Sequence, residues 1–283
     1  MTATKITHRQ ILQYRGDQCE TRPDLIAVEA PLEIRIAWGP AFARKEKTWL
    51  MTLRTPGADE ELIWGLLLSE GIIREKKEVL QLEPCVKAKG DTYVVELDPA
   101  VQVDWENMGR QGLMTGACGL CGKELIESSL EGCQVSPPTD LKLWPEQLFS
   151  LAGQMAQLQA GFKHTGGLHA AALFDREGQI CLLREDIGRH NAMDKLIGAA
   201  WQRELLPLSE YLVCWSSRAS FELVQKALRA GLPLAVAMSA PSSLAIELAE
   251  AAQLSLIGFL REDRFNLYTD TRDLIHASTP IQA

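Results

Sequence analysis

The sequence has no apolar run that approaches the length of a transmembrane helix. Its most apolar stretches, residues 62–68 and 232–238, fall far short of the ~20 residues that a membrane span needs. It also lacks an excess of positive charge, because 29 Lys and Arg residues face 37 Asp and Glu residues and the formal net charge is −8. We therefore expect no membrane and no nucleic acid among its partners, although a small local anion pocket is compatible with this charge.

Cysteine and histidine are scarce, with seven and five residues among 283. The odd cysteine count, and the lack of an apolar signal-peptide core in residues 1–13, do not fit a disulfide framework. We expect reduced thiols and a cytoplasmic location. Cys181 and Cys214 lie inside apolar runs and are predicted to be small core residues, whereas no partner pattern surrounds Cys19, Cys85 and Cys133.

The composition is that of an ordinary globular protein, 46% hydrophobic and 23% charged, in a chain long enough to bury a sizeable core. The order of elements predicts an α/β fold of mixed α+β type. We divide the chain into a β-rich N-terminal domain (residues 1–103) with one helix, a flexible glycine-rich segment (104–139) and an α/β domain (140–283). Glycines recur through residues 109–122, so the middle segment has no preferred conformation in sequence terms.

The N-terminal hundred residues indicate strands and one helix. Alternating apolar and charged residues predict a half-buried strand over residues 26–37, paired with residues 49–53. Residues 92–97 form a further predicted strand. Asp59 is the predicted cap of a helix that Gly71 ends. The apolar stripe of this helix is formed by Leu62, Ile63, Leu66 and Leu67.

Strands and helices alternate in the C-terminal half. The first helix there has a predicted apolar face formed by Leu148, Leu151, Met155 and Leu158. Residues 168–174 and 179–184 are predicted to form a hairpin. Apolar strands at 211–215, 234–238, 254–260 and 264–269 alternate with helices at 191–201, 220–230 and 242–252. This order predicts a parallel or mixed sheet covered by helices on both faces.

Cys118 and Cys121 form a CxxC pair in the run GACGLCGK at residues 116–123. Such a pair serves metal binding, dithiol exchange or sulfur carriage, and a zinc site is disfavoured because no second pair of ligands is present at a similar spacing. A thioredoxin-type pair follows a strand, whereas this one follows a glycine-rich run. An accessible loop suits a persulfide carrier, and Lys123 with a following helix favours the thiolate. The surroundings favour sulfur carriage and leave dithiol exchange open.

Serine, glycine and arginine gather where three predicted strands lead into helices, at residues 184–190, 216–220 and 239–243. Helix N-termini beyond the carboxyl ends of strands offer free N–H groups to anions. Ordinary N-capping explains one serine at each helix, but it does not explain Arg189 and Arg218. A phosphate or pyrophosphate site is the favoured interpretation, and other polar residues of these loops and of the chain end belong to it: Ser217, Ser239, Arg261 and Arg264.

His169 stands at the start of a predicted strand, after two glycines. A histidine among small residues in a strand is more often a core residue than a catalyst. Gly166 and Gly167, however, allow a ligand to approach the backbone closely. His169 therefore remains a candidate binding residue.

Taken in order, these motifs resemble the formate dehydrogenase accessory sulfurtransferase family (FdhD), over about residues 62–270. The matching runs are LLSEGII at 67–73, CGLCG at 118–122, GLHAA at 167–171, EDIGRHNAMDK at 185–195, SSRASFE at 216–222 and SAPSSLA at 239–245. A CxxC pair alone is a weak signal, whereas the ordered series is specific.

The resemblance implies a sulfur carrier that takes sulfur from a cysteine desulfurase and transfers it to the bis-molybdopterin guanine dinucleotide cofactor (Mo-bis-MGD), for formate dehydrogenase. It implies Cys118 as the persulfide carrier with Cys121 as its partner, a homodimer, and a cytidine-deaminase-like three-layer domain in the C-terminal half. No metal is expected on protein side chains. The run at 259–264 is implied to contact the cofactor through Phe259, Leu260, Arg261, Glu262, Asp263 and Arg264.

A deaminase-like fold does not imply zinc-dependent deamination in this chain. That chemistry needs a Glu shortly after the first ligand, whereas His169 is followed by Ala170 and Ala171. Two other functions remain as alternatives. One is a dithiol oxidoreductase, and the other is a non-catalytic chaperone that binds the cofactor and hands it to its enzyme.

Overall fold

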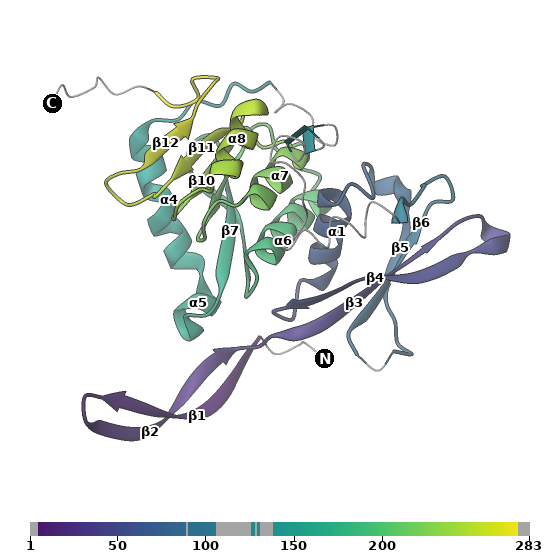
Figure 1. The fold of residues 1–283 in the computed structure, drawn as a ribbon, viewed down its shortest axis with the longest axis horizontal. Coiled ribbons are helices and arrows are strands. Elements are labelled where there is room, and N and C mark those ends of the chain that lie inside the picture. Colours follow the sequence, from purple (N-terminus) through teal and green to yellow (C-terminus); the bar gives the residue numbers. More distant parts are fainter. Residues whose placement is uncertain (1–4, 89, 106–125, 128, 131–137, 277–283) are drawn as a thin grey trace.

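Three β-sheets organise the chain in the computed structural model, which describes residues 5–88, 90–105, 126–127, 129–130 and 138–276. A six-stranded sheet from the C-terminal half and a four-stranded sheet from the N-terminal half lie side by side, and a two-stranded arm projects away from both (Figure 1). The chain is therefore a mixed α/β protein. Across the described ranges, we find no helix with the length and apolar character of a membrane span.

The six-stranded sheet has the order β12-β11-β10-β9-β7-β8. Strands β7 (His169–Phe174) and β8 (Ile180–Asp186) form the predicted hairpin. The next three strands run parallel to one another, and the last pairs antiparallel at the edge: β9 (Leu212–Trp215), β10 (Leu234–Ala237), β11 (Ser255–Gly258) and β12 (Asn266–Thr269). The alternating pattern of the sequence is thus confirmed as a mixed sheet.

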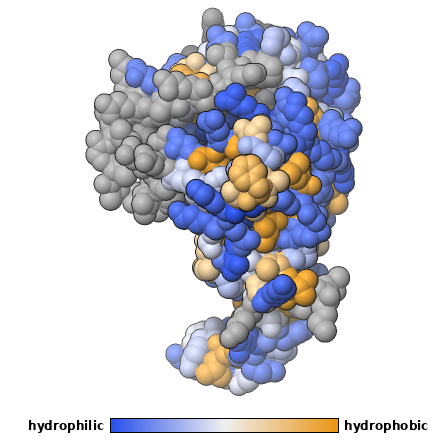
Figure 2. All heavy atoms as spheres, turned by 90° about the vertical axis from the view of Figure 1, so that its right-hand side faces the viewer, coloured by the Kyte–Doolittle hydropathy of each residue, from blue (hydrophilic) through white to orange (hydrophobic). Residues whose placement is uncertain are grey.

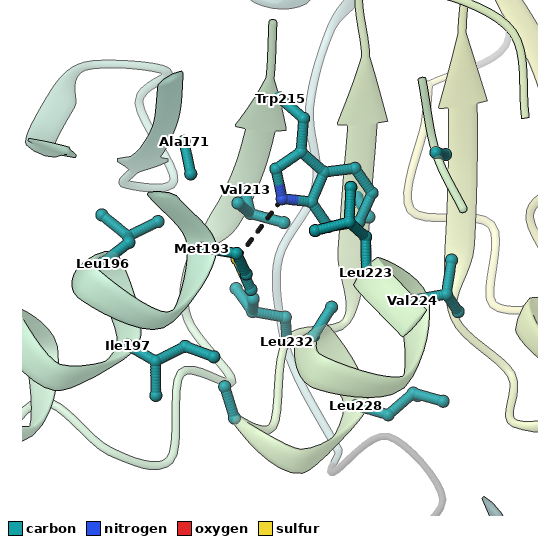
Figure 3. Close-up of a cluster of buried hydrophobic side chains, with 14 of the residues drawn as sticks. Ala171, Met193, Leu196, Ile197, Val213, Trp215, Leu223, Val224, Leu228 and Leu232 are labelled. Atoms are coloured by element: carbon teal, nitrogen blue, oxygen red, sulfur yellow. Dashed lines mark hydrogen bonds between the residues drawn. The ribbon is translucent and has the colours of Figure 1, made fainter. Parts of the chain in front are cut away.

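Helices cover both faces of this sheet, as predicted. One face carries α6 (Arg189–Gln202), α7 (Phe221–Arg229) and α8 (Ser243–Ala251), and the other carries α4 (Pro145–Leu158). Alternate residues of β9 enter the two cores, with Trp215 on the α6 side and Cys214 on the α4 side. The Trp215 indole N–H donates to the Met193 sulfur at 3.3 Å, so even the polar atom of this large side chain is paired (Figure 3).

The N-terminal sheet has the order β4-β3-β6-β5 and comprises β3 (Ala30–Trp38), β4 (Lys45–Arg54), β5 (Val79–Pro84) and β6 (Thr92–Leu97). Leu32, Ile34 and Ile36 of β3 are buried in alternation, as predicted. The predicted strand over residues 26–37 was wrong in its limits, because it joins two elements. The arm strand β2 (Gln18–Ala27) ends before β3 begins, where the chain passes from the arm into the sheet.

Helix α1 (Asp59–Ser69) buries the predicted stripe of four apolar residues under this sheet. The predicted capping role of Asp59 was wrong. Ala58 occupies the N-cap position with φ +57°, and the Asp59 carboxylate instead accepts hydrogen bonds from the buried Arg54 guanidinium at 2.9 and 3.0 Å. An ion pair with a buried arginine outweighs a cap in this turn. Leu158 also departs from its predicted apolar face, because it is 52% exposed at the end of α4.

The arm is a hairpin of β1 (Ile6–Arg15) and β2, paired antiparallel along its whole length. Figure 1 shows it leaving the body below the short helix α5 (Ala160–Thr165). Two short 3₁₀ turns, η1 (Ala41–Ala43) and η2 (Lys76–Glu78), complete the N-terminal part. On the side of the four-stranded sheet, apolar side chains are scattered among polar ones (Figure 2), and the exposed ones include Phe42, Met51, Leu53 and Leu80.

Candidate functional site

The predicted binding loops meet at one edge of the six-stranded sheet. Strands β9, β10 and β11 run parallel, so the loops that follow them leave the sheet on the same side. Strand β7 is antiparallel to β9 and β8, so the start of β7 and the end of β8 lie at this same edge. We call it the strand-end edge: residues 184–190, 216–220, 239–243 and 259–264, with His169 at the start of β7. Open sheets with this topology bind ligands at such an edge.

Arg189 and two histidines form the most polar cluster of the strand-end edge. Burial lowers the pKa of His169, and the charge of Arg189 lowers it further. Burial, again with Arg189, lowers the pKa of His190 to about 4. Both imidazoles are therefore neutral at pH 7. The Nε atom of Arg189 is buried and has no hydrogen-bond partner among the described residues, so this edge contains an unsatisfied cationic donor.

The neighbouring side chains partly balance this arginine. His190 Nε2 lies 3.3 Å from Ser220 Oγ and 3.8 Å from a Glu222 oxygen. Burial raises the pKa of Glu222, but hydrogen bonds from its own N–H and from Ser220, with the charge of Arg189, lower it overall. An anionic ligand at Arg189 would thus approach beside one carboxylate.

In the loop after β9, the two serines hold the loop in place and the arginine is exposed. Ser216 Oγ accepts a hydrogen bond from the Ala170 N–H at 2.9 Å and ties the loop to β7. Ser217 is buried and donates to the Arg218 carbonyl at 3.0 Å. Arg218 is exposed. Of these residues, Arg218 offers the accessible charge.

Ordinary N-capping accounts for only part of the serine pattern. Ser242 caps α8 by accepting a hydrogen bond from the Ala245 N–H at 3.2 Å. Neither Gly188 before α6 nor Ser220 before α7 makes a side-chain capping hydrogen bond. The first N–H groups of α6 thus have no cap from position 188, which is compatible with an anion site, whereas at α7 the Glu222 carboxylate accepts a hydrogen bond from its own N–H.

The turn after β11 folds back on the loop after β10. The Phe259 N–H donates to the Ser239 carbonyl at 3.2 Å, and the Arg261 guanidinium donates to the Met238 and Leu260 carbonyls at 2.6 and 2.7 Å. Leu260 is 1% exposed and belongs to the core on the α4 side, so its side chain is not presented to a ligand.

The exposed residues of this turn are Phe259, at 39%, and the charged Arg261, Glu262, Asp263 and Arg264. Arg264 lies 3.8 Å from Asp263, with both side chains more than 70% exposed. Glu262 and Asp263 are therefore exposed to solvent and do not belong to the cluster around Arg189. Phe259 and Arg264 remain the side chains of this turn with suitable chemistry for a nucleotide.

Several motif residues build the scaffold rather than the site. Asp186 is fully buried and accepts from the Thr55 N–H at 3.1 Å, while Lys195 lies 2.6 Å from its carboxylate. Asp194 is paired with Lys226 at 2.8 Å. Contacts of Asp186 and Lys195 with Thr55, and of Asp194 with Ser69, join this part of the fold to the N-terminal part of the chain. The sequence did carry a signal for them, since charged residues interrupt an otherwise apolar helix at 194 and 195.

The CxxC pair, Cys118 and Cys121, lies outside the described residues, as does Cys133. Just after it in sequence, Ile126 and Leu130 pack against the core on the α6 side, and Ser129 Oγ accepts a hydrogen bond from Gln225 at 3.0 Å. Within the part of the chain that the structure describes, no three His, Cys, Asp or Glu side chains are grouped to hold a metal ion.

The prediction of a core position is confirmed for Cys214 and wrong for Cys181. Cys214 is fully buried, as predicted, and burial raises the pKa of its thiol. The prediction for Cys181 was wrong, because its side chain is exposed. Among the strands that the structure describes, β8 is the last of its sheet, and an apolar run in an edge strand does not imply burial on both faces.

Fold and site together define a mixed α/β protein with an arginine- and serine-lined strand-end edge. The chain belongs to the FdhD/NarQ family, whose model matches residues 27–275. It is 42% identical over 272 residues to the "Sulfur carrier protein FdhD" of Mycobacterium bovis, covering 93% of this chain and 96% of that protein. It is also 42% identical over 268 residues to the protein of the same name from Streptomyces avermitilis, covering 92% of each.

A solved structure shares the fold. It comes from Desulfotalea psychrophila, is described as a candidate formate dehydrogenase accessory protein, and superposes with a TM-score of 0.73 over 96% of this chain and 100% of that chain. At 19% identity, this likeness supports the fold alone.

Proposed function

We propose that this protein carries sulfur from a cysteine desulfurase to Mo-bis-MGD, and that formate dehydrogenase activity depends on the transfer. The observation that carries the proposal is the strand-end edge, where Arg189 offers a buried, unpartnered N–H beside two neutral histidines. A guanine dinucleotide has phosphates for such a donor and for Arg218. The names of the relatives, sulfur carrier proteins over nearly their whole length, support the same activity.

The exposed Phe259 and Arg264 suit the remainder of this substrate. An aromatic ring stacks on a nucleobase, and an arginine adds a phosphate contact. Arg261 holds the turn in place through the Met238 carbonyl. Ser217 and Leu260 would contribute through their backbone, because their side chains are buried.

The sequence distance to a described residue limits how far the CxxC pair can lie from the core. Ile126 packs against the core on the α6 side, and four residues lie between it and Cys121 in the sequence. An extended chain spans at most about 3.6 Å per residue, so the Cα of Cys121 lies within about 18 Å of the Cα of Ile126. Helix α7 starts at the strand-end edge, after Ser220. This limit on Cys121 supports the proposal that the thiol pair acts near the domain that carries the strand-end edge.

The sulfur step is a thiolate exchange. The Cys118 thiolate attacks the terminal sulfur of the desulfurase persulfide, the donor S–S bond breaks, and the donor cysteine leaves as its thiolate. Cys118 then bears S–SH. Attack of the Cys121 thiolate on the Cys118 sulfur releases the terminal sulfur as sulfide for the cofactor and leaves a Cys118–Cys121 disulfide. A cellular dithiol reduces that disulfide and resets the carrier.

The remaining features of the proposal concern the fold and the setting. We infer a cytidine-deaminase-like arrangement for the C-terminal domain, a homodimer, and a cytoplasmic site of action. The mixed sheet with helices on both faces is compatible with that arrangement. The metal belongs to the substrate rather than to protein side chains.

Mass spectrometry after incubation with desulfurase and cysteine tests the carrier step. We expect the mass of one sulfur atom to be added to the protein and to Cys121→Ser, and not to Cys118→Ser. Cys181→Ser is the matched control, because Cys181 is an exposed cysteine outside the CxxC pair. An unchanged mass of the intact protein would contradict sulfur carriage.

The same variants separate the two alternatives. A dithiol oxidoreductase would show a reversible Cys118–Cys121 couple without bound sulfane sulfur. A non-catalytic chaperone would still support formate dehydrogenase with both cysteines replaced by alanine. We expect that double variant to bind nucleotide and to support no formate dehydrogenase activity.

A further inference from the structure

The arm formed by β1 and β2 has two faces of different chemistry. Successive residues of a strand point to opposite sides of a sheet, and directly paired residues point to the same side. In the register of the arm, every Asp, Glu, Lys and Arg of the two strands falls on one face: Arg9, Arg15, Glu20, Arg22 and Asp24. We call the opposite face the apolar arm face. It consists of residues 6, 8, 10, 12 and 14 of β1 and residues 19, 21, 23, 25 and 27 of β2.

The charged face pairs its polar groups within the arm. Arg9 stands directly opposite Asp24 in the ladder, and opposite charges at paired positions stabilise a sheet. The Arg22 guanidinium donates to the side-chain oxygen of Gln13 at 3.1 Å. Ile11 is half-buried among these long side chains. The charged face is therefore suited to solvent.

The body of the protein covers only the inner part of the apolar arm face. Helix α5 packs against β2, and a Cβ at Gly167 would lie 3.9 Å from the Ala27 Cβ. Beyond this base the arm projects away from the body (Figure 1). Leu12 is 61% exposed and Tyr14 is 68% exposed. The exposed outer part of the face comprises Gln10, Leu12, Tyr14, Cys19, Thr21 and Pro23.

A two-stranded hairpin is marginally stable by itself in water, and it needs a further strand or layer on its apolar face. The arm is nevertheless paired over its whole length, from Ile6 opposite Ala27 to Arg15 opposite Gln18. A ten-residue strand extends about 33 Å, so most of the arm lies beyond the short helix that covers its base. We therefore expect another layer to cover the outer part of the apolar arm face in the assembled protein.

The chemistry of this face favours a second copy of the chain as that layer. In a two-fold contact, the same patch of both copies meets, and residues near the axis lie against their own equivalents. An Asp, Glu, Lys or Arg there would face a like charge, and the apolar arm face has none. Surfaces that recognise a different protein use complementary charges. Two stacked arms would enclose Leu12 and Pro23 and leave the charged faces outside, as in a small β-sandwich.

The apolar surface continues onto the body at the base of the arm. Leu158 and Phe162 are 52% and 45% exposed, and Leu158 lines the same hollow as Ile6 of the arm. These two residues and the ten of the apolar arm face form a surface smaller than the 20–30 residues a side of a standard interface. We therefore expect a dimer that dissociates on dilution.

We propose that the outer part of the apolar arm face is the contact surface of a homodimer, in which the arms of two copies pack face to face about a two-fold axis. The contact rests on the homodimer of the proposed function and gives it a location. It does not depend on the sulfur chemistry.

Sedimentation velocity of the full chain over a series of concentrations tests the contact. We expect a reversible change from a monomer of 31.3 kDa to a dimer. Leu12→Glu should raise the dissociation constant about 100-fold, because it brings like charges together across the axis. Gln18→Glu adds the same charge on the opposite face and should associate as the unchanged protein does. Both positions are exposed, and thermal unfolding should show the same stability of the body in both variants.

Alkylation of Cys19 with iodoacetamide locates the contact. Cys19 lies on the apolar arm face, and Cys181 is an exposed cysteine outside the arm that serves as the internal reference. The ratio of the labelling rates of Cys19 and Cys181 should fall as the protein concentration rises through the dissociation constant. In Leu12→Glu, the ratio should stay constant over the same range.

Three results would overturn the proposal. The first is a chain that stays monomeric throughout the series, even if its arm binds a cysteine desulfurase. The second is a dimer that forms equally well in Leu12→Glu, since its contact would lie elsewhere. The third is an equal loss in Leu12→Glu and Gln18→Glu, which would follow from net charge. Sulfur loading is measured on the same samples by mass spectrometry. A protein that dimerises through the arm but takes up no sulfur would contradict sulfur carriage and support the contact.

Discussion

Gly65 of α1 lies directly against the main chain of α6 at Asp194, so closely that a Cβ at position 65 would be 1.9 Å from the Asp194 carbonyl oxygen. The contact is reciprocal, since a Cβ at Gly198 would be 1.8 Å from the Glu61 carbonyl oxygen. The two helices pack backbone to backbone at these glycines. This crossing joins the N-terminal sheet to the domain that carries the strand-end edge.

Gly65→Ala should destabilise the protein by about 3 kcal/mol, the upper range for overpacking, because the added Cβ meets backbone atoms that cannot turn away. Urea unfolding followed by circular dichroism measures the free energy. Gly153→Ala in α4 is the matched control, since nothing lies within 4 Å of its new Cβ. There the loss of glycine's backbone freedom should stabilise the helix by about 0.5–1 kcal/mol. Equal effects at both positions would refute the close crossing.

Lys226→Met should lower the free energy of unfolding by about 3–5 kcal/mol. The substitution leaves the carboxylate of Asp194, which is 1% exposed, without the ammonium group that pairs with it. Burial already raises the pKa of Asp194, and Lys226 opposes this rise. The double variant Lys226→Met/Asp194→Leu removes both charges and should regain most of the loss. Urea unfolding of the four proteins of this cycle gives the coupling, and an additive result would contradict a direct pair.

The stability of the protein should fall between pH 6.5 and about 4 through His190. Its folded pKa of about 4 lies below the unfolded value of 6.5, so the unfolded chain binds more protons in this window. The contribution of His190 is complete above pH 6.5 and is lost as the pH falls towards 4. Thermal unfolding from pH 4 to 8 should show a flatter dependence for His190→Gln. His8→Gln, on the exposed arm, should follow the unchanged protein; parallel curves for both variants would refute the assignment.

Arg189→Gln should weaken GDP binding about 10- to 100-fold, which corresponds to a charge-assisted hydrogen bond of about 1.5–3 kcal/mol. GDP serves as the probe because it presents the guanine and phosphate groups of the proposed substrate. Titration calorimetry measures the affinity. Arg203→Gln, exposed at the other end of α6, should leave it unchanged. Equal losses in both variants would point to net charge rather than to a site at Arg189.

Native alkylation with iodoacetamide should separate the cysteines by exposure. We expect Cys19 and Cys181 to be labelled in the folded protein, because both are exposed. Cys214 should react only after unfolding, since it is fully buried and burial also raises the pKa of its thiol. Peptide mapping by mass spectrometry reads each site. Labelling of Cys214 before Cys181 would contradict the placement of β8 at the sheet edge.

The sequence predicted those features that depend on local periodicity. The stripe of α1 and the alternation in β3 are confirmed because the helical and strand repeats require a buried side whatever the partner is. The alternating strands and helices of the C-terminal half likewise imply a sheet whose loops share an edge, and the structure brings Arg189, Arg218 and His169 to it. The limits of the three predicted domains stay a prediction.

The tertiary structure alone decided which partner each of these elements has. Asp59 bonds Arg54 instead of capping its helix, and Cys181 is exposed because β8 is an edge strand. From the sequence alone, Gly65 is a residue that weakens a helix. The structure shows that it lies against Asp194, which is far from it in the sequence. For the CxxC pair, the sequence is the basis of the proposed thiol chemistry, since residue type and spacing are local. The burial of the Arg189 Nε atom and the ion pair of Lys195 with Asp186 depended on long-range packing, which no local pattern encodes.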